Sequence, residues 1–150
     1  MTGNTFDEAA QAAREDAEAR GATMIEPFDS RDTVVGQGTV AAEILAQLTG
    51  QGSELDTIVV PVGGGGLLAG VTSYLADMSP RTAIVGVEPR GAASLHAAME
   101  AGEPVTLADI DPFVDGAAVK RIGDFPYQVI EENQGRTPVS YTHLTLPTSD

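Results

Sequence analysis

The sequence predicts an α/β fold, a three-layer arrangement of a parallel sheet with helices on both faces. Two short apolar runs, Thr57–Val62 and Thr82–Val87, have the length and the β-branched content of buried strands. The segment from about Leu67 to Asp77, between them, has the length and apolar content of a helix. Because parallel neighbours need a crossover of this size, the three segments indicate a right-handed strand–helix–strand unit. Sheets of this kind are covered on both faces.

The remaining elements follow from local signals. Thr5-Phe6-Asp7-Glu8 fits a capping box, and Gly21 is a typical residue after a helix end. Runs that are short and apolar predict strands, clusters of glycine predict loops, and apolar residues at helical spacing predict helices. In chain order the expected elements are helix Thr5–Arg20, strand Ala22–Glu26, loop Gly36–Thr39, helix Val40–Leu48, helix Ala92–Ala101 and strand Tyr127–Glu131.

Four consecutive glycines, Gly63 to Gly66, lie between the first strand of the unit and its helix. Glycine has no Cβ, so the chain can turn sharply there and bring its N–H groups against an anion. The helix that follows adds about half a positive charge at its N-terminus. The alternative is a simple tight turn, which one or two glycines would make with less loss of entropy. The pattern therefore favours a phosphate-binding loop.

Charge and composition exclude several classes of partner. The formal net charge is −14, which disfavours binding to nucleic acid or to anionic membranes. The chain has no cysteine, so it has no disulfide framework. It shows no signal-peptide pattern at its start and no apolar run near the roughly 20 residues that span a bilayer. We therefore expect a cytoplasmic protein that binds a small molecule, with no nucleic acid and no membrane as partner.

A dinucleotide-binding module is one alternative that the residues alone allow. Gly64, Gly66 and Ala69 satisfy the pattern G-x-G-x-x-A after a strand. Glu88 ends the next strand at about the distance where such folds place the acid that binds the ribose. The competing interpretation of Glu88 is a solvated carboxylate at a strand end.

A family resemblance decides between these classes. Five motifs occur in a fixed order, and together they closely resemble the threonine dehydratase (threonine ammonia-lyase) family of fold type II pyridoxal-phosphate enzymes: Pro27-Phe28-Asp29, Gly36–Ala41, Val60–Leu67, Gly86–Pro89 and Asp115–Arg121. The resemblance runs from Thr2 to Arg136. It implies pyridoxal 5'-phosphate as cofactor, L-threonine or also L-serine as substrate, 2-oxobutanoate and ammonia as the products from threonine, and a homo-oligomeric parent enzyme.

The resemblance also implies site residues. In the family the tetraglycine loop holds the cofactor phosphate, which corresponds here to Gly63, Gly64, Gly65, Gly66 and Leu67. Gly116 matches a position where the backbone approaches the pyridine ring, with a turn glycine as the alternative. Related serine racemases and dehydratases bind a divalent cation at positions that match Glu88, Ala92 and Ser94. Serine in place of an acid disfavours a hard cation, so Glu88 is either a metal ligand or a surface or interface acid.

No catalytic residue is expected in this chain. The Schiff-base lysine of the family lies in a Ser-Phe-Lys-type motif, which this sequence does not contain. Lys120 is the only lysine, and it stands beside Arg121 in a different family motif, where a charged residue at a loop rim is the better interpretation. We therefore expect the chain alone to be inactive.

The domain organisation follows from where the resemblance stops. We expect residues 1–136 to be part of a pyridoxal-phosphate-dependent catalytic domain, with the lysine-bearing and C-terminal parts missing. Residues 137–150 continue no earlier pattern and resemble a translated sequencing adapter, so we expect a non-native, unstructured tail. Serine dehydratase, serine racemase and threonine synthase are alternatives within the same fold, because the phosphate loop does not determine substrate specificity. A further alternative is a structural fragment without ligand affinity.

Overall fold

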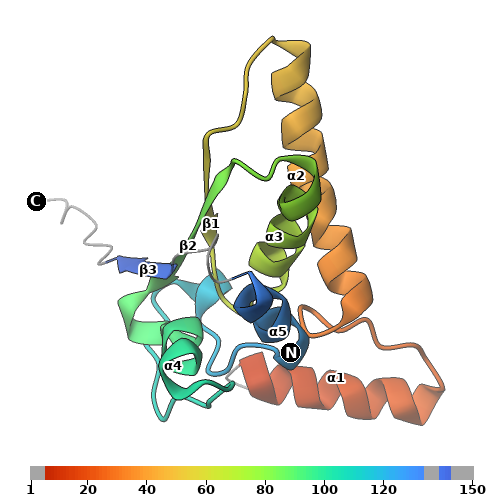
Figure 1. The fold of residues 1–150 in the computed structure, drawn as a ribbon. Coiled ribbons are helices and arrows are strands. Elements are labelled where there is room, and N and C mark those ends of the chain that lie inside the picture. The colour runs from red at the N-terminus through yellow and green to blue at the C-terminus, as the bar shows by residue number, and fades with distance from the viewer. Residues whose placement is uncertain (1–5, 134–138, 143–150) are drawn as a thin grey trace, which may run out of the picture.

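The computed structural model describes residues 6–133 and 139–142 of the 150-residue chain. Its sheet has three parallel strands in the order β1 (Thr57–Pro61), β2 (Ala83–Pro89) and β3 (Val139–Thr142). The helix α3 (Gly66–Met78) connects β1 to β2 and packs beside them (Figure 1). The predicted strand–helix–strand unit and the α/β fold class are thereby confirmed.

The first helix, α1 (Phe6–Arg20), ends where the sequence predicts. Gly21 follows it with φ +65°, a conformation that glycine adopts without steric cost. Thr5, the first residue of the expected capping box, lies outside the described residues. The strand expected at 22–26 is wrong, because this segment pairs with no strand. Its last carbonyl, at Glu26, instead accepts the hydroxyl of Thr33 at 2.7 Å.

The second helix, α2 (Arg31–Gly50), is longer than the sequence predicts. It begins at the N-cap Ser30 and runs through the residues expected to form a loop, Gly36–Thr39. The reason is packing against α3, because a Cβ on Gly70 would collide with the carbonyl of Val34. A Cβ on Gly38 would lie 3.1 Å from the carbonyl oxygen of Gly70. These glycines let two helix backbones touch, and they do not interrupt α2.

The C-terminal half of the described chain has two more helices. A short 3₁₀ turn, η1 (Arg90–Ala92), leads into α4 (Ser94–Ala101), which confirms the helix expected there. A second 3₁₀ turn, η2 (Asp115–Ala117), precedes α5 (Asp124–Glu132). The strand expected at Tyr127–Glu131 is wrong. Tyr127 and Ile130 are buried three residues apart on a helix that contacts α3. In a five-residue window, however, the apolar pair Tyr127 and Val129 also fits the alternation of a strand.

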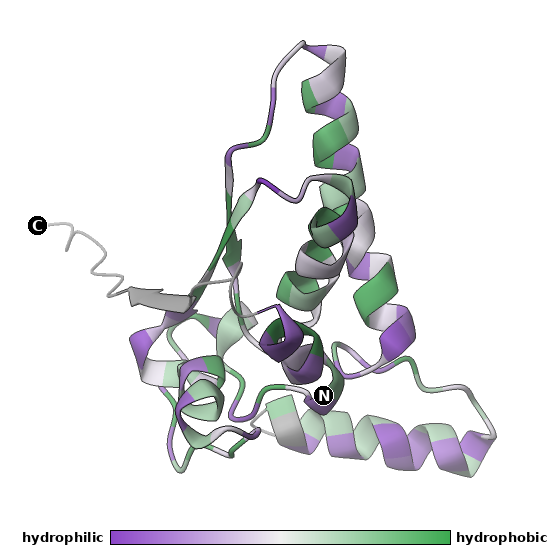
Figure 2. Ribbon diagram, viewed as in Figure 1, coloured by the Kyte–Doolittle hydropathy of each residue, from purple (hydrophilic) through white to green (hydrophobic). Residues whose placement is uncertain are grey.

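The core is centred on α3, which packs against the sheet, α2 and α5. Its fully buried members include Leu68 and Leu75 of α3 and Ile84 of β2. In Figure 2 hydrophobic colouring appears on β1, β2, α2 and α3, whereas much of α1 is hydrophilic. The opposite face of β1 is less covered, since Val59 is 63% exposed. No helix in the described ranges is both long and apolar enough to cross a bilayer.

The structure differs from the expected tail at four residues. Val139–Thr142 form β3, which pairs with β2 in parallel register from Gly86 to Pro89. Residues 137 and 138 and residues 143–150 lie outside the described part. The non-native origin of the tail stays a prediction.

Candidate functional site

The glycine loop presents a row of main-chain donors at the start of α3. Gly65 is the N-cap of this helix, with φ +89° and no side-chain cap. Among the hydrogen bonds of the described residues, none is donated by the N–H groups at positions 63 to 68. Unpaired donors together with the positive end of a helix dipole form a site for an anion.

These donors border a pocket of about 990 Å³. Its walls come from three parts of the chain: the start of α1 with the segment before α2, the glycine loop, and residues 109–120. The residues of the site expected from the sequence meet there, namely Gly63, Gly64, Gly65, Gly66, Leu67 and Gly116. Lys120 lines the same pocket, and its ammonium group lies 3.4 Å from the carbonyl oxygen of Ala108.

The glycines are required by the protein's own packing. A Cβ on Gly64 would collide with the ring of Phe28, and one on Gly66 would lie 3.1 Å from the Cα of that residue. A Cβ on Gly65 would lie 2.9 Å from the side chain of Ile122. The loop is therefore clamped between the segment before α2 and the segment before α5. From the sequence we inferred that these positions lack side chains so that a ligand can approach. That explanation is incomplete, because Phe28 and Ile122 occupy the space where the side chains would be.

Gly116 is different from the four loop glycines. A Cβ built on it would meet nothing within 4 Å, and its φ is not positive. Gly116 lies in the 3₁₀ turn η2, but neither packing nor a positive φ requires glycine at this position. Gly116 is exposed and lines the pocket.

Glu88 is fully buried and caps α4. Its two carboxylate oxygens accept the N–H groups of Leu95 at 2.7 Å and of His96 at 2.8 Å. Burial raises the pKa of Glu88 above its ordinary value of 4.5, although the two N–H donors oppose this shift. The expectation of a solvated acid at the surface is wrong, because Glu88 is fully buried.

Metal binding by Glu88 stays a prediction. The described residues contain no group of three or more His, Cys, Asp or Glu side chains that could hold a metal ion. Ser94 lies close by in the sequence, and its buried hydroxyl has no hydrogen-bond partner among the described residues. A cation would have to share the Glu88 oxygens with two backbone amides.

Three residues that support the loop carried no functional role in the sequence argument. They are Phe28, whose ring lies against Gly64; Asp29, whose carboxylate accepts the N–H of Phe125 at 3.0 Å; and Gly123, whose N–H donates to the carbonyl of Gly64 at 3.1 Å. Phe28 and Asp29 stand in one of the five motifs. The motif therefore marked both residues in the sequence. Their role could not be inferred from it, because Asp29 bonds to Phe125, which is 96 residues away.

Comparison with known proteins shows which family the chain resembles. A model of the family "pyridoxal-phosphate dependent enzyme" matches residues 1–140. L-threonine dehydratase biosynthetic IlvA of Corynebacterium glutamicum is 69% identical over 136 residues, which cover 91% of this chain and 31% of that protein. The chain therefore spans about a third of the length of this curated relative.

Solved structures agree as well. Processed threonine deaminase isoform 2 of Solanum lycopersicum has a TM-score of 0.80 at 38% identity, over 93% of this chain and 39% of that one. Maize serine racemase has a TM-score of 0.77 at 31% identity, over 92% of this chain and 41% of that one. Because the family model matches residues 1–140, nearly the whole chain, the chain belongs to the pyridoxal-phosphate dependent enzymes.

Proposed function

We propose that this chain supplies the phosphate-binding part of the pyridoxal 5'-phosphate site in a biosynthetic threonine dehydratase, which deaminates L-threonine to 2-oxobutanoate and ammonia. The observation that carries the proposal is the row of unpartnered N–H groups from Gly63 to Leu67 facing a pocket at the N-terminus of α3. The 69% identity with the Corynebacterium glutamicum relative supports the substrate.

The residues present fit the cofactor. A phosphate dianion needs several hydrogen-bond donors, and the loop offers main-chain amides together with the favourable end of a helix dipole. The space beside Gly116 suits a flat ring, because no protein atom lies within 4 Å of where its Cβ would be. When bound, the cofactor supplies electron withdrawal from the α-carbon of the amino acid, and the protein binds and orients it.

Within this division of labour the chain's own residues bind and orient. Gly63, Gly64, Gly65, Gly66 and Leu67 hold the phosphoryl end, and Gly116 leaves room for the ring. The lysine that captures the cofactor lies outside residues 1–150, since Lys120 belongs to another motif and to the rim of the pocket. We expect the full enzyme to be a cytoplasmic homo-oligomer.

A chimeric enzyme tests the proposal. In it, this chain replaces the matched segment of the Corynebacterium glutamicum relative. We expect the chimera to bind pyridoxal phosphate and to release 2-oxobutanoate from L-threonine, whereas the 150-residue chain mixed with the cofactor should release none. Gly116→Val should abolish activity in a chimera that still folds, because the new side chain fills ligand space. Ser73→Val is the control at an exposed position of α3.

Two outcomes would contradict the proposal. One is a folded chimera that binds no pyridoxal phosphate. The other is a chimera that racemises L-serine faster than it deaminates L-threonine, which would favour the racemase alternative. The dinucleotide-binding alternative is tested by titrating the chain with NAD and, separately, with pyridoxal phosphate. Binding of NAD but not of pyridoxal phosphate would favour that alternative.

A further inference from the structure

We propose that Asp29 is a positioning residue for the glycine loop, aiming the N–H of Gly65 at the anion by way of α5. The inference rests on the proposed function of the loop as a phosphate site. It adds a residue that touches neither the phosphate nor the ring. Its basis is a chain of contacts that runs from Asp29 through the start of α5 to a single peptide group of the loop.

The first contact is a helix cap supplied from a distant part of the chain. Asp29 Oδ1 accepts the N–H of Phe125, the second residue of α5, at 3.0 Å. The N-cap of α5 is Gly123, which has no side chain to perform this task. A Cβ on Gly123 would lie 2.9 Å from Cβ, Cγ and Oδ1 of Asp29, so the carboxylate rests directly against it. Asp29 thereby fixes the start of α5.

The second contact joins α5 to the loop. The N–H of Gly123 donates to the carbonyl oxygen of Gly64 at 3.1 Å. In a planar trans peptide the N–H points opposite to the carbonyl. The bond from Gly123 therefore turns the N–H of Gly65 away from α5. The next peptide is held in the same manner, because the carbonyl of Gly65 accepts the N–H of Ala69 at 2.9 Å.

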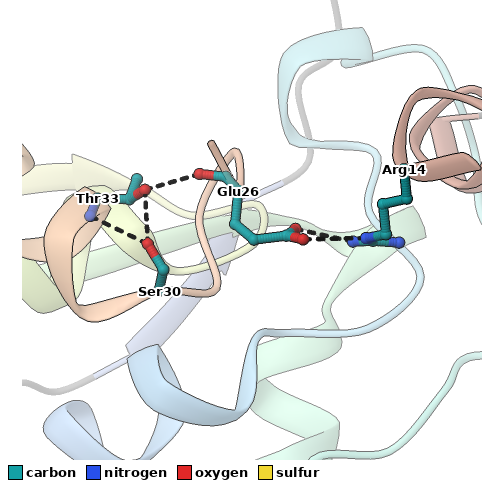
Figure 3. A network of polar contacts seen from close by, with 4 residues as sticks. All are labelled: Arg14, Glu26, Ser30 and Thr33. Carbon is teal, nitrogen blue, oxygen red and sulfur yellow. Dashed lines mark hydrogen bonds and ion pairs between the residues drawn. The ribbon is translucent and has the colours of Figure 1, made fainter. Parts of the chain in front are cut away.

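The segment that carries Asp29 is itself fixed on both sides. The hydroxyl of Thr33 donates to the carbonyl of Glu26 at 2.7 Å, and Ser30 caps α2 by accepting the N–H of Thr33 at 3.1 Å (Figure 3). The carboxylate of Glu26 pairs with Arg14 of α1 at 2.8 Å. Phe28 lies against Gly64. Asp29 is therefore held in place between two anchored neighbours, as a positioning residue must be.

Charge and geometry predict opposite effects of removing Asp29. A carboxylate near an anion site repels the anion, so on charge alone Asp29→Ala and Asp29→Asn should both tighten phosphate binding. If Asp29 acts by position, Asp29→Ala should weaken binding, whereas Asp29→Asn keeps an oxygen acceptor for Phe125 and should not. The sign of the effect therefore separates the two explanations.

The experiment measures phosphate and cofactor binding rather than turnover. Inorganic phosphate is titrated into the 150-residue chain while the amide resonance of Gly65 is followed by NMR, and the dissociation constant of pyridoxal phosphate is measured in the chimera. We expect Asp29→Ala to weaken both by about tenfold or more, the loss of one well-aimed bond to a charged group. It should also shift the Gly65 amide resonance before phosphate is added. Asp29→Asn should stay within about twofold of the unsubstituted protein.

Asp77→Ala is the matched control, because it removes one exposed carboxylate from α3 without touching the loop. The inference would be overturned if Asp29→Ala bound phosphate as tightly as Asp77→Ala or more tightly. It would also be overturned if Asp29→Asn bound phosphate as weakly as Asp29→Ala does. An Asp29→Ala chimera that does not fold would also count against it, since a positioning role predicts a folded protein. If the unsubstituted chain and chimera bind neither probe, the proposed function fails and this inference with it.

Discussion

At the scale of single residues, glycines that look alike in the sequence have different reasons to be glycine. Gly64, Gly65 and Gly66 each face a protein neighbour at the place where a Cβ would stand. Gly116 has no neighbour there and lines the pocket. Substitutions should therefore affect folding at the first three positions and ligand binding at the last.

Gly64→Ala and Gly116→Ala form a matched pair that tests this difference. Gly64→Ala should destabilise the fold by about 1–3 kcal/mol, because the methyl group overpacks against the Phe28 ring. Gly116→Ala should change stability by no more than about 0.5 kcal/mol, as expected of a substitution with no close neighbour. Thermal or denaturant unfolding measures both. Equal loss of stability in the two variants would contradict the assignment.

Glu88 provides a pH-dependent contribution to stability. Its pKa in the folded chain is raised above the ordinary 4.5, chiefly by burial, so the folded state holds the proton more tightly than the unfolded state. Its contribution to folding is therefore full below the unfolded pKa and is lost as pH rises through the folded pKa. In Glu88→Gln this component should be absent, so the difference in unfolding free energy between the two proteins should change with pH in that range. Parallel pH curves would show that Glu88 does not titrate as stated.

At the scale of elements, the long-range fit between α2 and α3 explains why α2 continues through residues 36–39. Gly36–Thr39 has the local composition of a loop, yet Gly38 is a buried contact of α2 with Gly70 of α3. A local window contains no information about the partner helix. The same limit explains α5, whose residues 127–131 fit either period until the contact with α3 selects the helix.

Ser30 should be a measurable determinant of α2. Its hydroxyl accepts the N–H of Thr33 at 3.1 Å in the N-cap position. Ser30→Ala should lower the free energy of unfolding by about 1 kcal/mol. The exposed Ser73, inside α3, is the control, and Ser73→Ala should be neutral or slightly stabilising because alanine has the higher helix propensity. Unfolding by urea followed by circular dichroism compares the two, and similar losses in both would argue against the cap.

At the scale of the whole molecule, our proposal is that the chain contributes one wall of a site that the full enzyme completes. It covers 31% of the curated relative, and one face of β1 carries the exposed Val59. The covalent chemistry attributed to the family requires a lysine, and Lys120 is the only one in this sequence. Lys120 lines the pocket, but it stands in a different family motif, and we assign it no covalent role.

Lys120→Ala in the chimera tests whether Lys120 has a covalent role. Because we assign cofactor capture to a lysine outside residues 1–150, the variant should keep the visible absorbance of bound pyridoxal phosphate and a substantial part of the threonine deaminase activity. The control is Arg81→Ala, which removes a cation far along the chain whose ion pair with Glu54 is exposed. Loss of the absorbance in Lys120→Ala alone would place the covalent residue in this chain.

The sequence by itself determined the strand–helix–strand unit, the position of the glycine loop at its first turn, and the family, because each depends on residues that are close together or on motifs in a fixed order. Only the tertiary structure decided which neighbours make the glycines necessary, that Glu88 is buried in a helix cap, and that Asp29 reaches α5. Those contacts join residues up to 96 positions apart. A local pattern follows from the repeat of the backbone, so neighbouring residues reveal it. The direction of a peptide N–H depends on the hydrogen bond that its carbonyl accepts, and the donor of that bond comes from a distant part of the chain.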